Sequence, residues 1–360
     1  MDVAAGATSP APDAGSSPAP QPPWPCDPSI ATGEGVTIKD SGACPGLLPA
    51  AVTCAADLTI CSGAANPPQG GNSAAAATSD GRGSVVLSCR RADVGPPLLN
   101  FLFVPTRSGF VSKAGLGVDV RPLADGFVVS EGSYQLPPPS YDFIAHDGNL
   151  RQGQRGGTLY ASATRAVIVR PTNGEIVAQS FTAAGELAAN ATLGSFSADA
   201  GSLMLGGAMN ASGATLVIWQ VYGESKATAR WLAPDGTPGA PPFSIAGWTS
   251  NVPDSRGLAG GSVAIAAEPP SGASVRRWRG VIAPGETVER QAPAWLAARG
   301  DFLLLPEGKA MAFGNEILAG DGTVCGTVDL GAPLVGIGLD GTAFAARNQR
   351  TFRIYPQLLR

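Results

Sequence analysis

Histidine and lysine are nearly absent from this sequence of 360 residues, which contains one histidine, His146, and four lysines. Proton transfer at neutral pH usually depends on a histidine, or on a carboxylate or lysine with a shifted pKa. A Ser-His-Asp triad would therefore have a single candidate base. His146 lies in a turn, at a position that alanine, proline or glycine takes in similar turns along the chain. We therefore interpret His146 as a turn residue rather than a general base.

Charged residues make up only 14% of the chain, with a net charge of −4 and a sequence pI near 5.1. Nucleic-acid binding relies on basic surface that neutralises phosphates, so this balance argues against a nucleic-acid partner. The main basic cluster is Arg276, Arg277 and Arg279 around Trp278. We interpret it as a solvated strand edge, which charge protects from pairing with other chains, rather than as an anion site.

Long apolar runs are missing as well. None approaches the ~20 residues that a membrane-spanning helix requires, so we expect no transmembrane segment. The start of the chain has no basic stretch followed by an apolar core, so it does not resemble a signal peptide. Our hypothesis is a secreted or lipid-anchored protein whose leader or lipid-bearing residue lies outside this sequence. In that case Met1 stands in place of a removed leader.

Sequence motifs for common chemistries are absent too. The chain has no G-x-S-x-G elbow, phosphate-binding Walker loop, H-E-x-x-H pair or EF-hand loop. Zinc sites in small modules need close cysteine pairs such as C-x₂-C. The first four cysteines, Cys26, Cys44, Cys54 and Cys61, are instead separated by 17, 9 and 6 residues. We therefore predict no metal site and no cofactor.

These four cysteines favour a small module that is held together by disulfides, because short segments with little core need such links. Four cysteines allow three pairings, of which Cys26–Cys44 with Cys54–Cys61 joins nearest neighbours. The two remaining cysteines, Cys89 and Cys325, lie near opposite ends of the rest of the chain. A Cys89–Cys325 disulfide would help to close a ring, and the alternative is two buried thiols.

Glycine and proline are abundant, at 48 and 32 residues, which predicts many turns. An apolar strand followed by a tight turn recurs along the chain, and the sequence around residues 214–240 shows it most clearly. The turn glycines are separated by 37, 51, 49 and 37 residues, and they are Gly148, Gly185, Gly236, Gly285 and Gly322. We expect glycine at positive φ in the Asp235-Gly236 and Asp321-Gly322 turns.

This period of about 35–50 residues is typical of four-stranded propeller blades. A single hairpin cannot bury its apolar face, whereas blades stacked around an axis bury both faces of each sheet. The sequence therefore predicts an all-β protein, a β-propeller of six or seven four-stranded blades with seven preferred, plus a small Cys-rich N-terminal module. The alternative folds are a large β-sandwich and a solenoid.

The predicted organisation has four parts. Residues 1–23 form a Pro/Ala/Ser tether that we expect to be disordered. Residues 24–61 form the Cys-rich disulfide module, residues 62–80 form a linker, and residues 81–360 form the propeller.

The spacer, the cysteines and the hairpins with Asp-Gly turns together resemble the degenerate β-propellers of secreted proteins and lipoproteins of Gram-negative bacteria. Twenty arginines against four lysines, with much alanine, glycine and proline, agree with a GC-rich genome. The resemblance implies a location in the cell envelope, that is the periplasm or outer-membrane surface, or outside the cell. It implies no particular substrate.

Two functions fit such a fold. The first is a non-enzymatic binding or scaffold propeller that recognises a protein or glycan at the cell surface through its loops, where we expect Tyr134, Tyr141 and Trp248 to be exposed and to bind. The alternative is a glycosidase or lyase whose carboxylates meet in the central channel. The candidate acids are Asp119, Asp142, Asp199 and Asp254. A pair about 5–10 Å apart in the channel would favour the enzyme, and a lining of small apolar residues would favour the scaffold.

Overall fold

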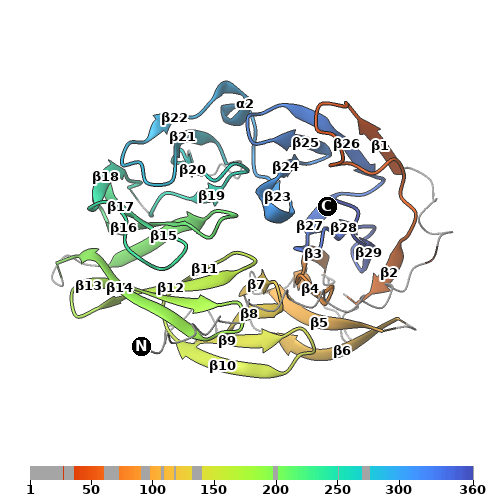
Figure 1. Ribbon diagram of the computed structural model, residues 1–360, viewed down its shortest axis with the longest axis horizontal. Helices are drawn as coiled ribbons and strands as arrows, with labels where there is room; N and C mark the ends of the chain where they lie inside the picture. The colour runs from red at the N-terminus through yellow and green to blue at the C-terminus, as the bar shows by residue number, and fades with distance from the viewer. Residues whose placement is uncertain are drawn as a thin grey trace, which may run out of the picture.

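The computed structural model describes residue 27 and residues 36–60, 73–90, 98–106, 109–116, 119–131, 140–197, 202–249, 251–269 and 276–359. Their strands form seven separate antiparallel sheets, six with four strands and one with five. The sheets stand side by side in a closed ring around a central opening (Figure 1). The chain is therefore a seven-bladed β-propeller, as the repeat predicts.

Blades 1 to 5 are each continuous in sequence, and the chain runs from the axis outward in every one. Blade 1 consists of β3 (Ser73–Ser79), β4 (Val85–Arg90), β5 (Leu98–Thr106) and β6 (Gly109–Leu116). Blade 2 consists of β7 (Asp119–Leu123), β8 (Gly126–Glu131), β9 (Ser140–Ala145) and β10 (Leu150–Arg155). Blade 3 consists of β11 (Thr158–Ala161), β12 (Arg165–Thr172), β13 (Glu175–Thr182) and β14 (Leu187–Ser195).

The next two blades follow the same order. Blade 4 consists of β15 (Leu203–Met209), β16 (Thr215–Val221), β17 (Lys226–Leu232) and β18 (Phe243–Ala246). Blade 5 consists of β19 (Ser255–Gly257), β20 (Val263–Ala266), β21 (Trp278–Ile282) and β22 (Arg290–Gln291). A single helical turn, α2 (Ala294–Ala297), leads from blade 5 to blade 6.

Blades 6 and 7 combine strands from both ends of the sequence. Blade 6 consists of β23 (Leu303–Leu304), β24 (Ala310–Phe313), β25 (Glu316–Ala319) and β26 (Val324–Leu330), with β1 (Val36–Asp40) paired outside β26. Blade 7 consists of β27 (Leu334–Ile337), β28 (Ala343–Ala346) and β29 (Thr351–Tyr355), with β2 (Ala56–Thr59) as its outermost strand.

Three strands therefore lie N-terminal to residue 81, where the sequence suggests that the propeller begins. β1 and β2 belong to blades 6 and 7, and β3 belongs to blade 1. The apolar pattern of residues 36–59 is weak because both strands lie at outer edges, where none of their residues is fully buried. The predicted tether, residues 1–23, lies outside the described residues.

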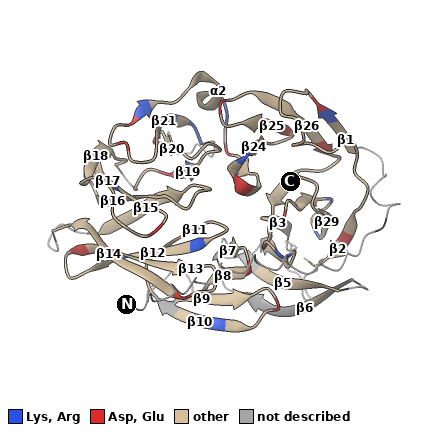
Figure 2. Ribbon diagram, in the orientation of Figure 1, with Lys and Arg blue, Asp and Glu red and all other residues tan. Residues whose placement is uncertain are grey.

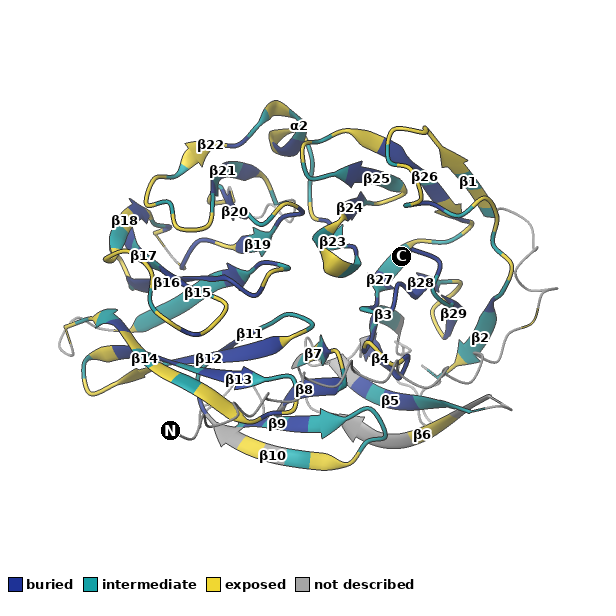
Figure 3. Ribbon diagram, in the orientation of Figure 1, coloured by how far each residue is buried: buried dark blue, intermediate teal, exposed yellow. Residues whose placement is uncertain are grey.

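The hydrophobic core is divided among the spaces between blades (Figure 3). In blade 4, β16 is buried at every position from Thr215 to Gln220, because blades 3 and 5 cover its two faces. One apolar cluster joins Leu216 and Ile218 of this strand to Val263 and Ile265 of blade 5. Burying such side chains contributes roughly 1.5–3 kcal/mol each, so neighbouring blades stabilise one another. Because both faces of these strands are buried, their sequences are continuous apolar runs rather than alternations of apolar and polar residues.

Polar tips of aromatic residues also join neighbouring blades. Buried tyrosine and tryptophan usually find an acceptor for their O–H or N–H group. Here the acceptor is a main-chain carbonyl of the adjacent blade, or of the segment that enters it. The bonds run from Tyr160 Oη to Gly206 O (2.5 Å), from Trp231 Nε1 to Glu286 O (3.0 Å), from Trp278 Nε1 to Gly300 O (2.8 Å) and from Tyr355 Oη to Leu330 O (3.3 Å).

The predicted tight turns at Asp235-Gly236 and Asp321-Gly322 are confirmed. Gly236 has φ 90° and Gly322 has φ 89°. In each turn the aspartate accepts a main-chain hydrogen bond of 2.9 Å from the threonine two residues later. Gly236 is also packed against blade 3, because a Cβ there would lie 2.6 Å from the Cβ of Ala189.

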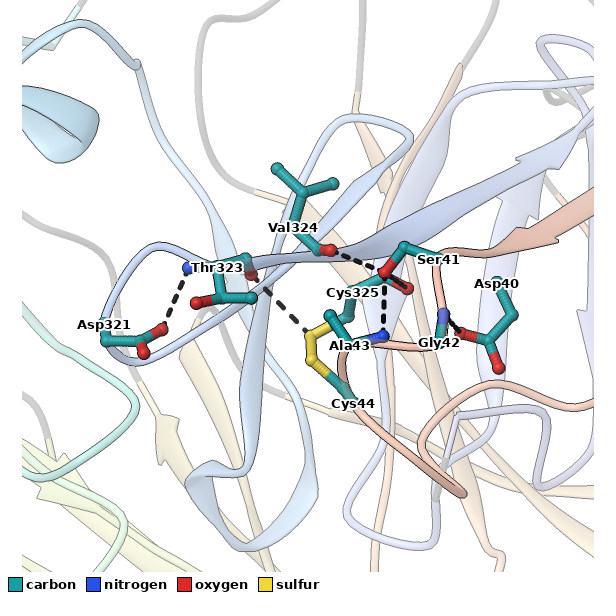
Figure 4. Close-up of a disulfide and its surroundings, with 9 residues drawn as sticks. All are labelled: Asp40, Ser41, Gly42, Ala43, Cys44, Asp321, Thr323, Val324 and Cys325. Atoms are coloured by element: carbon teal, nitrogen blue, oxygen red, sulfur yellow. Dashed lines mark hydrogen bonds between the residues drawn. A yellow bond between two sulfur atoms is a disulfide. The ribbon is translucent and has the colours of Figure 1, made fainter.

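A disulfide between Cys44 and Cys325 joins the segment after β1 to β26, across 281 residues of sequence (Figure 4). Beside it the Ser41 hydroxyl lies 2.7 Å from the carbonyl oxygen of Val324 and 2.9 Å from that of Cys325. The pairings Cys26–Cys44 and Cys89–Cys325 are therefore wrong. The first pairing depends on proximity in the sequence, whereas β1 pairs with β26, near the end of the propeller, rather than with segments close to it in the sequence.

The remaining described cysteines, Cys54 and Cys89, are also disulfide-bonded, so none of the described cysteines is free. Cys26 and Cys61, and with them the predicted Cys54–Cys61 pairing, lie outside the described residues. Disulfides persist in oxidising compartments, so this state is compatible with an extracellular location.

We predict that replacing the Cys44–Cys325 disulfide, in a Cys44→Ala/Cys325→Ala variant, lowers the stability of the ring. A cross-link over so long a loop stabilises by about 2–5 kcal/mol in the chain-entropy description, which corresponds to a melting temperature lower by about 3–8 °C. Differential scanning calorimetry measures this change in melting temperature. Val324→Ala, which trims an exposed neighbour (41% exposed), is the control. A double variant that melts with the wild type would contradict the prediction.

Candidate functional site

A cavity of about 590 Å³ lies where the innermost strands of six blades meet. Polar and apolar surface contribute about equally to its wall, and the larger apolar side chains there are Met209, Phe302, Leu303, Leu304, Leu334 and Val335. Three charged residues share the wall: Arg121 of blade 2, Arg256 of blade 5 and Asp301 at the entry to blade 6. The lining thus combines apolar side chains with polar surface of similar extent, so it is more polar than the usual small-molecule pocket.

The innermost strands explain how charge reaches this cavity. β7 and β19 are short edge strands, and an edge strand gains protection from unwanted pairing when it carries charge. In β7, the side chain of Leu123 is buried between blades, whereas Arg121, two residues earlier on the same strand, is exposed. In β19, Ser255 is buried and Arg256 is partly exposed. Figure 2 shows that charged residues elsewhere are scattered around the ring.

A turn from blade 6 lies beside this opening. The single 3₁₀ turn η1 (Pro306–Gly308) follows β23 directly, and its Gly308 packs against Ala211 of blade 4. A Cβ at Gly308 would lie only 2.4 Å from the Cβ of Ala211. The contact skips blade 5, and Figure 1 shows the turn that follows β23 on the inner side of the ring.

An ionic network runs from the cavity wall into blade 5. Nε of Arg256 lies 3.6 Å from a carboxylate oxygen of Asp301. The other Asp301 oxygen pairs with Arg276, and Arg276 also binds Asp254 at 2.9 Å. The guanidinium of Arg276 stacks 5.7 Å from the ring centre of Trp278. Arg276 is therefore held in an ion-pair network, rather than standing as a simple solvated edge.

The ion pairs of this network join two guanidinium groups, those of Arg256 and Arg276, to two carboxylates, those of Asp254 and Asp301. Burial lowers the pKa of Arg256, and the positive charges of Arg276 and Arg121 lower it further, against the opposing effect of Asp301. Arg121 is thus close enough to Arg256 for the two charges to interact.

The acid pair that would favour a glycosidase is not found among the described carboxylates. Asp301 is the only acidic residue among the described residues that line the cavity. Asp254 is bound by Arg276, and Asp142 lies on β9, two strands away from the axis. The side chain of Asp119 and the whole of Asp199 lie outside the described residues.

The expected exposure of Tyr141 and Trp248 is wrong. Tyr141 is 4% exposed on β9, and its hydroxyl donates a 2.8 Å hydrogen bond to the carbonyl of Gly157 at the start of blade 3. Trp248 is 6% exposed between β18 and β19, and its indole N–H lies 3.3 Å from the carbonyl of Ala266. Both residues join neighbouring blades, which is why they are buried. Tyr134 lies outside the described residues.

His146 lies in the turn between β9 and β10, as the sequence predicts. Its Nδ1 lies 3.0 Å from a guanidinium nitrogen of Arg82 and 3.3 Å from a carboxylate oxygen of Asp125. Its carbonyl accepts a 2.6 Å hydrogen bond from the hydroxyl of Ser84. Since Arg82 and Ser84 belong to blade 1, these contacts join blades 1 and 2.

A buried carboxylate pair lies between blades 7 and 1, and sequence reasoning missed it. Asp80 is fully buried, and its Oδ1 accepts main-chain bonds of 2.9 Å from Arg82 and Ser84. Its Oδ2 is buried with no hydrogen-bond partner. Asp340, which binds the Ser79 hydroxyl, lies close enough for its charge to act on Asp80. Burial, with this charge added, raises the pKa of Asp80 to about 7, and burial also raises that of Asp340.

Two features are absent from the described residues. No helix in this part of the chain is long and apolar enough to cross a membrane. In the same residues, no group of three or more histidine, cysteine or acidic side chains is arranged to hold a metal ion.

No known protein family and no curated protein matches this chain. Among solved structures, a prolyl endopeptidase is similar with 11% identity and a TM-score of 0.48, over 79% of this chain and 50% of that one. TolB from Acinetobacter baumannii is similar with 11% identity and a TM-score of 0.34, over 72% and 63%. The Dos1 propeller is similar with 9% identity and a TM-score of 0.38, over 84% and 94%.

The chain thus spans half the length of the endopeptidase and less than two thirds of that TolB chain. Similarities this distant carry no functional argument. The assignment as a seven-bladed propeller depends on the seven sheets themselves.

The buried carboxylate predicts how stability depends on pH. The pKa of Asp80 is raised from 3.8 to about 7 in the folded state, so the folded protein binds more protons than the unfolded chain between these values. The free energy of unfolding therefore falls as pH rises from about 4 to 7. Asp80→Asn should remove this loss and stabilise the protein at pH 8 by about 2–4 kcal/mol, with little effect at pH 4.

Urea unfolding at pH 4, 6 and 8 measures this effect. An amide suits the site, because Asn210 occupies the same turn of blade 4 and accepts a 3.0 Å main-chain bond from Ala214. Asp321→Asn is the matched control, since Asp321 is in an exposed turn and its pKa is lowered by the Thr323 bond. Equal stability of Asp80→Asn and wild type at pH 8 would contradict the prediction.

Proposed function

We propose that this chain is a non-enzymatic binding propeller of the cell envelope or the extracellular space. Its partner is a protein or a glycan, which contacts the loops around the central opening and places a group in the cavity. The observation that carries this proposal is the lining that the described residues give the cavity: apolar side chains, two arginines and one carboxylate, Asp301, that is already ion-paired.

This lining is suited to holding a ligand rather than to transforming one. Glycoside hydrolysis uses two carboxyl groups on opposite sides of the scissile bond. The described cavity residues supply one, and its two oxygens face Arg256 and Arg276. Both oxygens of this carboxylate are therefore already engaged in ion pairs. The described residues therefore give no support to the alternative of a glycosidase or lyase.

The oxidised cysteines support the proposed location. Cys44, Cys54, Cys89 and Cys325 are all disulfide-bonded, and such bonds are rare in reducing compartments. Disulfides, the closed ring and the buried blade interfaces make a rigid frame, on which loops present a binding surface at little entropic cost. A contribution from Tyr134, in the connection between β8 and β9, stays a prediction.

Affinity capture and turnover assays together test this function. Immobilised wild type should capture a defined protein or glycan from envelope and culture-supernatant fractions, whereas the variant Leu334→Glu/Arg256→Glu, which reverses charge in the cavity, should lose it. Val288→Glu, on an exposed residue (65% exposed) between β21 and β22, is the matched control and should capture as wild type does.

The same preparations should leave polysaccharides and glycosides unchanged. Turnover of any of them that is abolished by Asp301→Asn would overturn the proposal in favour of the enzyme. Equal capture by wild type and by the cavity variant would overturn the placement of the binding surface at the central opening.

A further inference from the structure

We propose that the junction between blades 7 and 1 is a pH-sensitive switch in the ring, which is closed while Asp80 carries a proton and opens locally once Asp80 is charged. The junction consists of the turn that follows β3 (residues 80–84) and the turn that follows β27 (residues 338–342). This inference does not depend on the proposed binding function. It depends on an unpartnered oxygen of Asp80, a second acid beside it and the close packing of the two turns.

The carboxyl group of Asp80 is only half satisfied by hydrogen bonds. Its Oδ1 accepts main-chain bonds of 2.9 Å from Arg82 and from Ser84, whereas its buried Oδ2 has no hydrogen-bond partner. A buried charge without a partner is strongly unfavourable, so a carboxyl group in this position takes up a proton instead. Burial accordingly raises the pKa of Asp80 to about 7.

Blade 4 contains the same turn with an amide in place of the acid. The Oδ1 of Asn210 accepts a 3.0 Å bond from the main chain four residues later, as that of Asp80 does in blade 1. The Nδ2 of Asn210 donates a 2.6 Å bond to the carbonyl oxygen of Gly261 in blade 5. A protonated carboxyl group has a donor, as this amide does, whereas a carboxylate only accepts. The turn is therefore suited to the neutral form of Asp80.

A second acid acts on Asp80 from the other side of the junction. Asp340, in the turn after β27, raises the pKa of Asp80 through its charge, although burial has the larger effect. The carboxylate of Asp340 is itself buried and binds the hydroxyl of Ser79, the last residue of β3. Charging Asp80 would therefore place two negative groups on opposite sides of the same junction, and their repulsion favours separation of the two turns.

The charged groups on the blade 2 side form ion pairs with one another. Arg82 gives Asp80 its main-chain N–H, but its guanidinium lies 2.8 Å from a carboxylate oxygen of Asp125 and 3.0 Å from Nδ1 of His146. Asp125 also pairs with Arg151 at 2.6 Å. The guanidinium of Arg82 is thus engaged with blade 2 rather than with the carboxylate of Asp80.

The two turns pack too closely for water to reach a charged Asp80. The main-chain N–H of Leu339 donates a 3.0 Å bond to the carbonyl of Ser79. A Cβ at Gly338 would lie only 1.6 Å from the hydroxyl oxygen of Ser79. Asp80 itself is fully buried. Its Oδ2 can therefore gain water only when the turns separate.

The separation can remain local because the second and third strands of these blades pack together independently of the turns. Leu87 and Phe103 of blade 1 share an apolar cluster with Phe344 and Phe352 of blade 7. The innermost strands that precede the two turns, β3 and β27, both contribute to the wall of the central cavity. Opening of the junction would therefore alter this wall while the ring stays closed farther out.

Hydrogen–deuterium exchange of the full chain, measured by mass spectrometry at pH 5, 6, 7 and 8, tests the switch. The open form of Asp80 has its ordinary pKa of 3.8 and the closed form a pKa of about 7. After correction for intrinsic exchange rates, peptides covering residues 73–84 and 334–342 should lose protection by about tenfold per pH unit from pH 5 to 7 and then level off.

Two further observations show whether the opening is local. At pH 7 these peptides should exchange at least tenfold faster than peptides from β16 in blade 4. Addition of 1 M urea should leave their exchange unchanged, because a local opening exposes little surface. Equal exchange in all blades would overturn the switch, although a pH-dependent global stability would remain.

Variants identify the group that titrates. Asp80→Asn should abolish the pH dependence of both peptides, because the amide has no proton to lose. Asp340→Asn should move the levelling-off to lower pH by half a unit or more, since it removes the repulsion. Asp321→Asn, in an exposed turn, is the matched control and should follow the wild type. A pH dependence that persists in Asp80→Asn, or wild-type protection independent of pH, would overturn the proposal.

A bound cation could also balance two buried carboxylates, so the exchange at pH 8 is repeated with 1 mM CaCl₂ and with EDTA. Equal protection in both is expected for a junction that responds to protons alone. Protection that calcium restores would overturn the proton switch in favour of a cation site.

Discussion

The closure of the ring between the two ends of the chain is the constraint on which the rest of this structure depends. β2 pairs with β29 to complete blade 7, and β1 pairs with β26 outside blade 6. Asp57 on β2 accepts hydrogen bonds of 2.8 and 3.0 Å from Arg353 and pairs with Arg347, so the added strand is also held by charge. The Cys44–Cys325 disulfide makes this closure covalent. Without this closure of the ring, the first and last blades would each expose an apolar face.

Closure also explains where the aromatic residues lie. A blade is stable only when its faces pack against the neighbouring blades. Large aromatic side chains therefore lie at the interfaces between blades, where their polar atoms form hydrogen bonds, as Tyr141 and Trp248 illustrate. Adjacent inner strands approach so closely that side chains are excluded in places: a Cβ at Gly336 of blade 7 would lie 1.8 Å from the carbonyl oxygen of Ala77 in blade 1. The buried pair of Asp80 and Asp340 lies at this same junction, where desolvation raises the pKa of both groups.

The central cavity follows from the same geometry. Seven inner strands cannot meet on the axis, because each carries a sheet about 10 Å from the next. Their free edges therefore surround a space, and the residues on those edges determine its chemistry. Here apolar side chains share the lining with polar surface of similar extent, and Arg121 and Arg256 lie on two edges with Asp301 beside a third. Arg256 and Arg276 of blade 5 both pair with Asp301, and Arg276 also pairs with Asp254, so the charge on this edge belongs to an ion-pair network.

The sequence by itself determined the all-β class, the repeating hairpin, the tight turns at Gly236 and Gly322 and the preference for seven blades, because periodicity and turn chemistry are local properties. It also identified His146 as a turn residue. Only the tertiary structure decided the Cys44–Cys325 pairing, the burial of Tyr141 and Trp248, and the cavity that joins Arg121, Arg256 and Asp301. These features bring together residues that are up to 281 positions apart in the chain. Such proximity is set by how the blades pack and close into a ring, which no local pattern encodes.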